Sequence, residues 1–154
     1  YSQERIGKNK KIFKVYKFRT MIPDAESLTG AVWSTKNDPR ITKIGHLLRK
    51  TALDEIPQLL NIIKGDMSFV GPRAERPELH NQFIKNLPEF DKRLEVTPGL
   101  SGLAQISGSY DLDPSKKIKY DIDYIKKMNL LLDIKIIILS VLNSLLARWD
   151  TPEN

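Results

Sequence analysis

The sequence predicts a mixed α/β (α+β) fold, dominated by helices, in a single domain. Its 154 residues have the size of one domain, and 40% of them are hydrophobic, which is enough to bury one core. Apolar residues recur at helical spacing through most of the chain, so amphipathic helices suited to a core or a membrane interface are expected. Strand-like patterns are confined to residues 11–21 and 103–106, so the strand component is small.

The first third of the chain predicts one edge strand and one helix. Residues 11–21 interleave β-branched and aromatic side chains with lysines, as an edge strand does. A short helix is expected from Pro23 to Glu26, followed by a loop over residues 30–40 that is rich in turn formers. From residue 41 the apolar positions step at helical intervals, which predicts a helix that ends near Thr51.

The next helix is expected close to residues 54–64. Proline is tolerated only in the first helical turn, so Pro57 fixes the start at about Leu53 or Asp54. Gly65 stands where a left-handed C-terminal cap belongs. Asp54 and Glu55 are therefore predicted at a helix N-terminus.

The second half of the chain predicts three more helices. Pro77 opens one, and Asp113 with the proline that follows it forms an N-cap and first turn for another. Residues 136–147 are nearly all apolar, but twelve residues are too few to span a bilayer. This last helix is expected in the core or in a membrane interface.

The composition excludes several classes of chemistry. The chain contains no cysteine, which excludes disulfides, thiolate zinc sites and a cysteine nucleophile. Two histidines, His46 and His80, are too few for a histidine-rich metal site. Carboxylates must therefore carry most of the available chemistry.

The net charge of +6 is concentrated at the start of the chain. Residues 1–20 contain seven cations and one carboxylate, Glu4, so they account for all of it. A basic segment of this kind attracts an anionic partner, which can be nucleic acid, a phosphorylated substrate or acidic lipid. The chain also begins with Tyr1 and shows no signal-peptide pattern, so we expect it to be part of a longer protein.

Asp54 and Glu55 form the sharpest candidate site. The positive end of a helix dipole keeps carboxylates ionised, and a carboxylate pair binds a hard divalent cation. Taken alone, such a pair is more often ordinary capping than a functional site. Arg49 and Arg73 lie nearby in sequence, and arginines beside carboxylates that hold Mg²⁺ are the groups that phosphoryl transfer requires.

Residues 48–61 and 64–73 closely resemble the bacterial sugar transferase family, the monotopic polyprenyl-phosphate phosphoglycosyltransferases. The resemblance covers nearly the whole chain. Further blocks match in order at residues 3–8, 16–21, 37–42, 98–105 and 120–125.

The resemblance implies a reaction and a set of site residues. A sugar 1-phosphate is transferred from a UDP-sugar to a membrane polyprenyl (undecaprenyl) phosphate, releasing UMP, through a covalent aspartyl-phosphosugar. This is the first membrane step in the synthesis of exopolysaccharide, capsule, O-antigen of lipopolysaccharide, or protein-linked glycans. Asp54 is implied as the nucleophile and Glu55 as its dyad partner, with Mg²⁺ as the required ion bound by both. The implied substrate-binding residues are Arg49, Arg73, Asp121 and Arg19.

The resemblance also indicates where the chain belongs. The hydrophobic re-entrant helix that precedes the first block in the family is missing, and residues 29–33 and 74–78 are similar to the long members. We therefore expect residues 1–154 to be a C-terminal catalytic domain without its N-terminal membrane region. It would work at the cytoplasmic face of the bacterial cell membrane, with residues 1–20 and 136–147 approaching the anionic leaflet, and the full-length protein is compatible with a homo-oligomer.

Two positions depart from the family pattern, and the identity of the sugar is left open. Ala74 stands where a second proline is common, and Ser107 stands where asparagine is frequent. Galactose, glucose and N-acetylated sugars all remain candidates.

Two alternatives make no use of the carboxylate pair. A nucleic-acid-binding module would display aromatic residues among lysines, as Phe13, Tyr16 and Phe18 are placed. A non-catalytic membrane-surface protein would explain the basic start and the apolar residues 136–147. Because both leave Asp54 and Glu55 unexplained, we expect an enzyme with no nucleic-acid partner.

Overall fold

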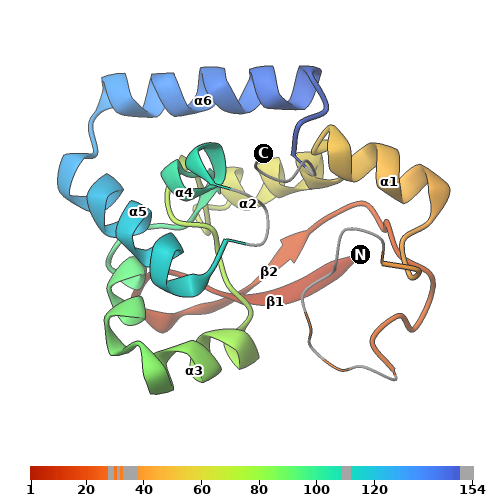
Figure 1. Ribbon diagram of the computed structural model, residues 1–154, viewed down its shortest axis with the longest axis horizontal. Coiled ribbons are helices and arrows are strands. Elements are labelled where there is room, and N and C mark those ends of the chain that lie inside the picture. Colours follow the sequence, from red (N-terminus) through yellow and green to blue (C-terminus); the bar gives the residue numbers. More distant parts are fainter. Residues whose placement is uncertain (28–29, 31, 33–37, 109–111, 150–154) are drawn as a thin grey trace.

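The computed structural model describes residues 1–27, 30, 32, 38–108 and 112–149. The strands are β1 Ser2–Ile6, β2 Ile12–Tyr16, β3 Ser68–Val70 and β4 Gly99–Ser101. The α-helices are α1 Lys43–Lys50, α2 Leu59–Ile63, α3 Pro77–Asn86, α4 Leu103–Ser107, α5 Pro114–Lys127 and α6 Leu130–Leu145. Three 3₁₀ segments complete the described elements: η1 Lys8–Lys10, η2 Leu53–Gln58 and η3 Pro88–Glu95. The predicted helix-dominated α/β fold is confirmed (Figure 1).

The first sheet is an antiparallel hairpin of β1 and β2, in which Ser2 pairs with Tyr16 and Ile6 with Ile12. Phe13 and Val15 on β2 are buried against Met67 and Ala74. The strand expected over residues 11–21 thus ends earlier, at Tyr16, and its partner β1 was not predicted. Because Phe13 is buried, the aromatic residues of this segment do not share one exposed face.

The second sheet consists of β3 and β4, which pair in parallel. The strand predicted over residues 103–106 is wrong, because these residues form α4. Leu103 and Ile106 lie three positions apart, so a helix directs both towards the cluster of Val70, Tyr124 and Ile136. A strand would have directed them to opposite faces.

Local capping explains where the helices begin and end. The Thr42 side chain accepts a hydrogen bond from Gly45 N at the start of α1, and Asp113 caps α5 through Ser115 N, as predicted. Gly65 has the predicted left-handed conformation, with φ +78°. Residues 23–27 form turns instead of the expected short helix, because Asp24 is left-handed, with φ 54°.

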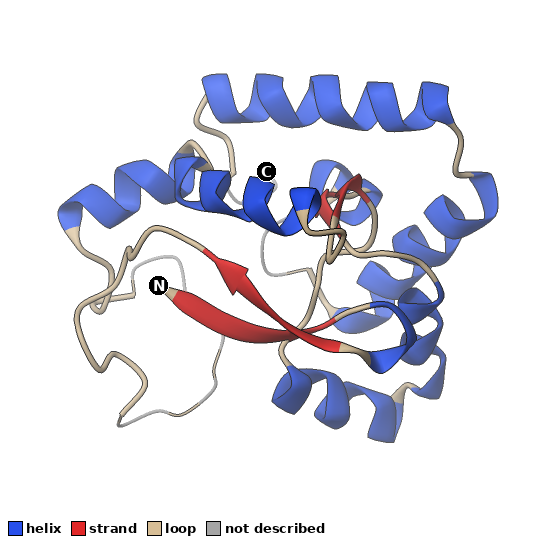
Figure 2. Cartoon of the chain, turned by 180° about the vertical axis from the view of Figure 1, so that it is seen from behind, coloured by secondary structure: helices blue, strands red, loops and turns tan. Residues whose placement is uncertain are grey.

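The last helix is longer than predicted and begins earlier. α6 starts at Leu130, where the Asn129 side chain accepts a hydrogen bond from Leu132 N. It runs along one edge of the molecule, and α3 and the hairpin lie on the opposite side (Figures 1 and 2). Within the described residues, no helix has both the length and the hydropathy needed to cross a bilayer.

Candidate active site

The structure contains a large cavity of about 940 Å³, lined by the segment after β2, by η2, by the loop after β3 and by parts of α4, α5 and α6. All six residues proposed from the sequence lie on its walls: Arg19, Arg49, Asp54, Glu55, Arg73 and Asp121. They come from five separate stretches of the chain, so the fold alone brings them together.

A sharp turn after α1 brings the carboxylate pair to the cavity. Ala52 is left-handed, with φ 54°, and it precedes the first turn of η2, which contains Asp54 and Glu55. The helix predicted over residues 54–64 is instead a 3₁₀ segment followed by the short α2. Pro57 contributes to this difference, because it lacks the N–H that a regular α-helical hydrogen bond needs. The Asp54 carbonyl accepts a hydrogen bond from Phe18 N at 2.9 Å, which joins η2 to the segment after β2.

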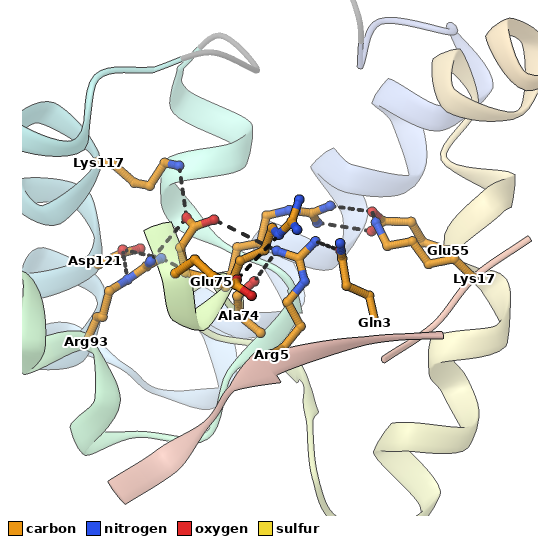
Figure 3. Close-up of polar contacts among 12 residues, drawn as sticks. Gln3, Arg5, Lys17, Glu55, Ala74, Glu75, Arg93, Lys117 and Asp121 are labelled. Atoms are coloured by element: carbon orange, nitrogen blue, oxygen red, sulfur yellow. Dashed lines mark hydrogen bonds and ion pairs between the residues drawn. The ribbon is translucent and has the colours of Figure 1, made fainter. Parts of the chain in front are cut away.

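Both carboxylate oxygens of Glu55 are occupied by cations. Lys17 Nζ lies 2.6 Å from Oε1, and Arg73 Nη1 donates to Oε2 at 3.1 Å while its Nη2 donates to Oε1 (Figure 3). Burial alone would raise the pKa of Glu55, but the charges of Arg73 and Lys17 outweigh it and hold the pKa well below its usual range. Glu55 therefore stays ionised and fixes two cations beside Asp54. Lys17, expected at the membrane, instead contacts Glu55 in the cavity.

Asp54 differs from its neighbour in its surroundings. It is 7% exposed, and the structure describes no hydrogen bond or ion pair to its carboxylate. Burial raises its pKa above the ordinary value, an effect that Lys17 opposes and the charge of Glu55 strengthens. The side chain lines the cavity as a carboxylate without a described bonding partner, which is the state a nucleophile or a metal ligand requires.

Arg49 reaches the cavity because α1 packs closely on the segment after β2. A Cβ at Gly45 would lie 2.1 Å from the Thr20 carbonyl oxygen, so only glycine permits this approach. Arg49 follows one turn later, and its Nε donates to Thr20 Oγ1 at 2.9 Å. Arg19, next to Thr20, is exposed at the cavity edge, with its guanidinium 5.6 Å from the Tyr1 ring.

Arg73 is held in place through its backbone. Arg93 Nη2 donates to the Arg73 carbonyl at 2.9 Å. The same guanidinium pairs with Asp121, with Nε at 3.0 Å and Nη2 at 2.9 Å from Oδ2 (Figure 3). Asp121 and Arg93 are each only 2% exposed. Burial raises the pKa of Asp121, and Arg93 opposes that shift.

Glu75 forms a second charged cluster, which was not predicted from the sequence. Its carboxylate lies 3.8 Å from Arg5 Nη1, 3.6 Å from Arg93 Nη1 and 3.5 Å from Lys117 Nζ (Figure 3). Burial would raise the pKa of Glu75, but Lys117, Arg93 and Arg5 together lower it. Burial lowers the pKa of Lys117. The sequence does contain one indication of this cluster. Arg93 lies close to the apolar Phe90 and Leu94, and a cation that is buried with such residues needs a carboxylate partner.

The donor set around Asp54 permits a divalent cation with few protein ligands. Within the described part of the chain, no group of three or more histidine or carboxylate ligands comes together. Both oxygens of Glu55 are taken by Lys17 and Arg73, whereas Asp54 faces the cavity. Mg²⁺ is commonly held by one carboxylate together with waters and substrate phosphates, and Asp54 fits that role.

Known proteins match this chain over nearly its whole length. The profile of the family described as bacterial sugar transferase matches residues 1–147. A galactosyl transferase of Streptococcus agalactiae is 42% identical over 152 residues, which cover 92% of this chain and 33% of the relative. A UDP-glucose:undecaprenyl-phosphate glucose-1-phosphate transferase of Xanthomonas campestris is 38% identical over 150 residues, covering 94% of this chain and 31% of the relative.

A shorter relative matches over most of its own length. An exopolysaccharide production protein of Rhizobium leguminosarum is 40% identical over 153 residues, covering 94% of this chain and 76% of the relative. The chain thus spans about a third of the two transferases above and three quarters of this protein. With the family profile matched over residues 1–147, the chain belongs to the bacterial sugar transferase family.

Proposed function

We propose that this chain transfers a sugar 1-phosphate from a UDP-sugar to a polyprenyl phosphate and releases UMP. The observation that carries the proposal is the cavity in which Asp54 faces open space beside Glu55, Lys17 and Arg73. The names of the relatives support the substrate classes, since one of them is a UDP-glucose:undecaprenyl-phosphate transferase.

The first displacement forms a bond between Asp54 and the sugar phosphate. An Asp54 oxygen attacks the phosphorus that carries the sugar, and the bond from that phosphorus to the bridging oxygen breaks, so UMP leaves with the electron pair. Arg73 and Lys17, held by Glu55, and Arg49, held by Thr20, provide positive charge for the phosphate oxygens.

The second displacement regenerates the carboxylate. A phosphate oxygen of the polyprenyl phosphate attacks the same phosphorus, and the bond to Asp54 breaks. The product is polyprenyl-diphospho-sugar. Each step needs only one phosphate ester in place at a time, so the mechanism is ping-pong.

Mg²⁺ belongs to this proposal as the cofactor, with Asp54 as its protein ligand. When bound, it would neutralise phosphate charge in the cavity. Glu55, whose oxygens are both paired with cations, would act as the anchor for Lys17 and Arg73.

The function is tested by incubating the chain with Mg²⁺ and a panel of UDP-sugars in the absence of any polyprenyl phosphate. Release of up to one equivalent of UMP per chain, with the sugar phosphate left on the protein, supports the proposal. The sugar that gives the fastest release identifies the donor. Absence of UMP with every UDP-sugar tested, in a folded protein, would refute it.

The pH dependence of UMP release reports on Asp54. Only the ionised carboxylate attacks, and burial raises its pKa, so the rate is expected to fall on acidification with a midpoint above 3.8. Lys17→Met removes a charge that lowers this pKa, so the midpoint should move up; Glu55→Gln removes one that raises it, so the midpoint should move down. Single-turnover UMP release against pH measures all three midpoints. Shifts of the opposite sign would contradict the assignment.

We propose in addition that the chain rests on a membrane surface through one apolar face. Exposed apolar side chains gather on α1, η2, α2 and α6: Ile44, Leu47, Ile56, Leu60, Ile63, Leu131, Ile138 and Leu142. The exposed Lys11 and Lys14 lie on the hairpin, which is on the other side of the molecule from α6 (Figures 1 and 2). The apolar face therefore supplies the contact, and Lys50 and Lys135, which are exposed on α1 and α6, favour anionic lipid.

Vesicle sedimentation tests this orientation. The double variant Ile63→Asn/Leu131→Asn is expected to reduce partitioning onto anionic vesicles about tenfold, because two apolar side chains that are 81% and 79% exposed would no longer insert. Neutralising Lys11 and Lys14 on the hairpin serves as the control and should have a smaller effect. Binding should also weaken with salt. A loss confined to the lysine variant would place the hairpin, not the apolar face, at the membrane.

A further inference from the structure

The lining of the cavity divides by depth into a charged part and an apolar part. The charged side chains around Asp54 are buried: Asp54 is 7% exposed, and the side chains of Glu55 and Lys17 are 13% and 18% exposed. The apolar lining residues at the opening are far more exposed, with Phe18 at 52% and Ile56 at 47%. A ligand that fills the cavity therefore meets charge inside and, along the part of the rim that these apolar side chains form, hydrocarbon.

The apolar rim has two walls. One consists of Phe18, Ile56 and Leu59, from the segment after β2 and from η2 and α2. The other consists of Val141 and Leu145 on the C-terminal half of α6, which are 52% and 76% exposed. Both walls continue into apolar side chains outside the cavity, Leu60 beside Leu59 on α2, and Ile138 one turn before Val141 on α6.

The two substrates of the proposed reaction place different demands on this rim. A UDP-sugar is polar along its length and gains little from exposed hydrocarbon. A polyprenyl phosphate has an anionic head and an apolar chain, so its head matches Arg73 and Arg49 and its chain matches the rim. Burying its first isoprene units also removes from water apolar side chains that are otherwise exposed.

We propose that the groove between Leu59 on α2 and Val141 on α6 holds the first isoprene units of the lipid acceptor, with its phosphate directed towards Arg73. This assignment rests on the proposed function. The groove opens onto the apolar face formed by α2 and α6, so the acceptor can enter from the bilayer while its chain stays in hydrocarbon. Leu59 and Val141 are then binding residues for the acceptor, whereas the donor uses the charged interior.

Photolabelling locates the chain of the acceptor directly. The probe is farnesyl phosphate with a diazirine on its terminal isoprene unit, used below its critical micelle concentration with the 154-residue chain. We expect label on the peptides that contain residues 56–59 and 141–145, and we expect excess farnesyl phosphate to displace it at least about tenfold better than farnesol. Label elsewhere, or equal displacement by farnesol, would overturn the assignment.

Matched variants measure the contribution of the groove. Leu59→Asn and Val141→Asn should each weaken binding of farnesyl phosphate about tenfold. Their neighbours outside the cavity, Leu60→Asn and Ile138→Asn, make the same chemical change at residues that are 53% and 54% exposed, and they should retain the wild-type Kd. All four variants should keep the circular dichroism spectrum and the unfolding midpoint of the wild type, so that a change in Kd reports on binding and not on folding.

The results separate the groove from the proposed chemistry. If no UDP-sugar releases UMP but the labelling and the four Kd values are as expected, the transfer reaction is wrong and the lipid site stands. If UMP is released but Leu59→Asn and Val141→Asn bind farnesyl phosphate like the controls, the lipid site is wrong. If a second copy of the chain or another segment covers the groove, the probe should label neither wall. That result would also show that the lipid site is wrong.

Discussion

Replacing Asp54 by Asn is expected to reduce the rate of UMP release by at least about 10⁴-fold and to remove the covalent label from the protein. The amide has nearly the same shape as the carboxylate but is a much weaker nucleophile. The structure describes no bond to the Asp54 side chain that the change would break, so the protein should fold normally. Quenched-flow release of UMP and intact mass of the protein measure both effects.

Glu55→Gln is the matched control for this prediction. It removes the adjacent carboxylate, and with it the charge that holds Lys17 and Arg73. Release of UMP should become slower, because the cations are less well placed, but label should still appear on Asp54. Label that persists in Asp54→Asn, or that maps to another residue by peptide mass analysis, would show that the nucleophile is wrong even if the transfer reaction is right.

Replacing Arg93 by Met is expected to lower the free energy of unfolding by about 3–5 kcal/mol. Arg93 is 2% exposed. It forms ion pairs with Asp121 and Glu75 and donates a hydrogen bond to the Arg73 carbonyl. Methionine fills part of the volume but leaves two buried carboxylates without this cation. Urea denaturation followed by circular dichroism measures the loss.

Two further variants serve as controls for this prediction. Lys127→Met breaks the exposed ion pair with Asp123, whose side chains are 67% and 45% exposed, and should change stability by no more than about 0.5 kcal/mol. The double variant Arg93→Met/Asp121→Leu should recover part of the loss, because it removes one of the stranded charges. A loss below about 1 kcal/mol in Arg93→Met, or no recovery in the double variant, would mean that the buried pair does not stabilise the fold.

The local features of the chain were predictable because they depend on a few neighbouring residues. The N-cap of α5 at Asp113, the start of α3 at Pro77 and the left-handed Gly65 each follow from backbone chemistry that the sequence displays. The strand β1 was missed because its residues are polar and only its pairing with β2 defines it. The prediction of a strand at residues 103–106 was wrong, because the hydrophobic pattern of so short an apolar run does not distinguish a strand from a helix.

In the candidate site, too, some features depend on neighbouring residues and others on contacts between distant ones. The sequence by itself determined the family to which the chain belongs and the position of the carboxylate pair at the start of a helical segment, since both are properties of contiguous residues. Only the tertiary structure decided that Glu55 binds Lys17 and Arg73 while Asp54 faces the cavity, and that Arg93 links Asp121 to the Arg73 backbone. These contacts join residues 18 to 38 positions apart, and adjacent carboxylates acquire opposite pKa shifts only through the charges and burial that such contacts create.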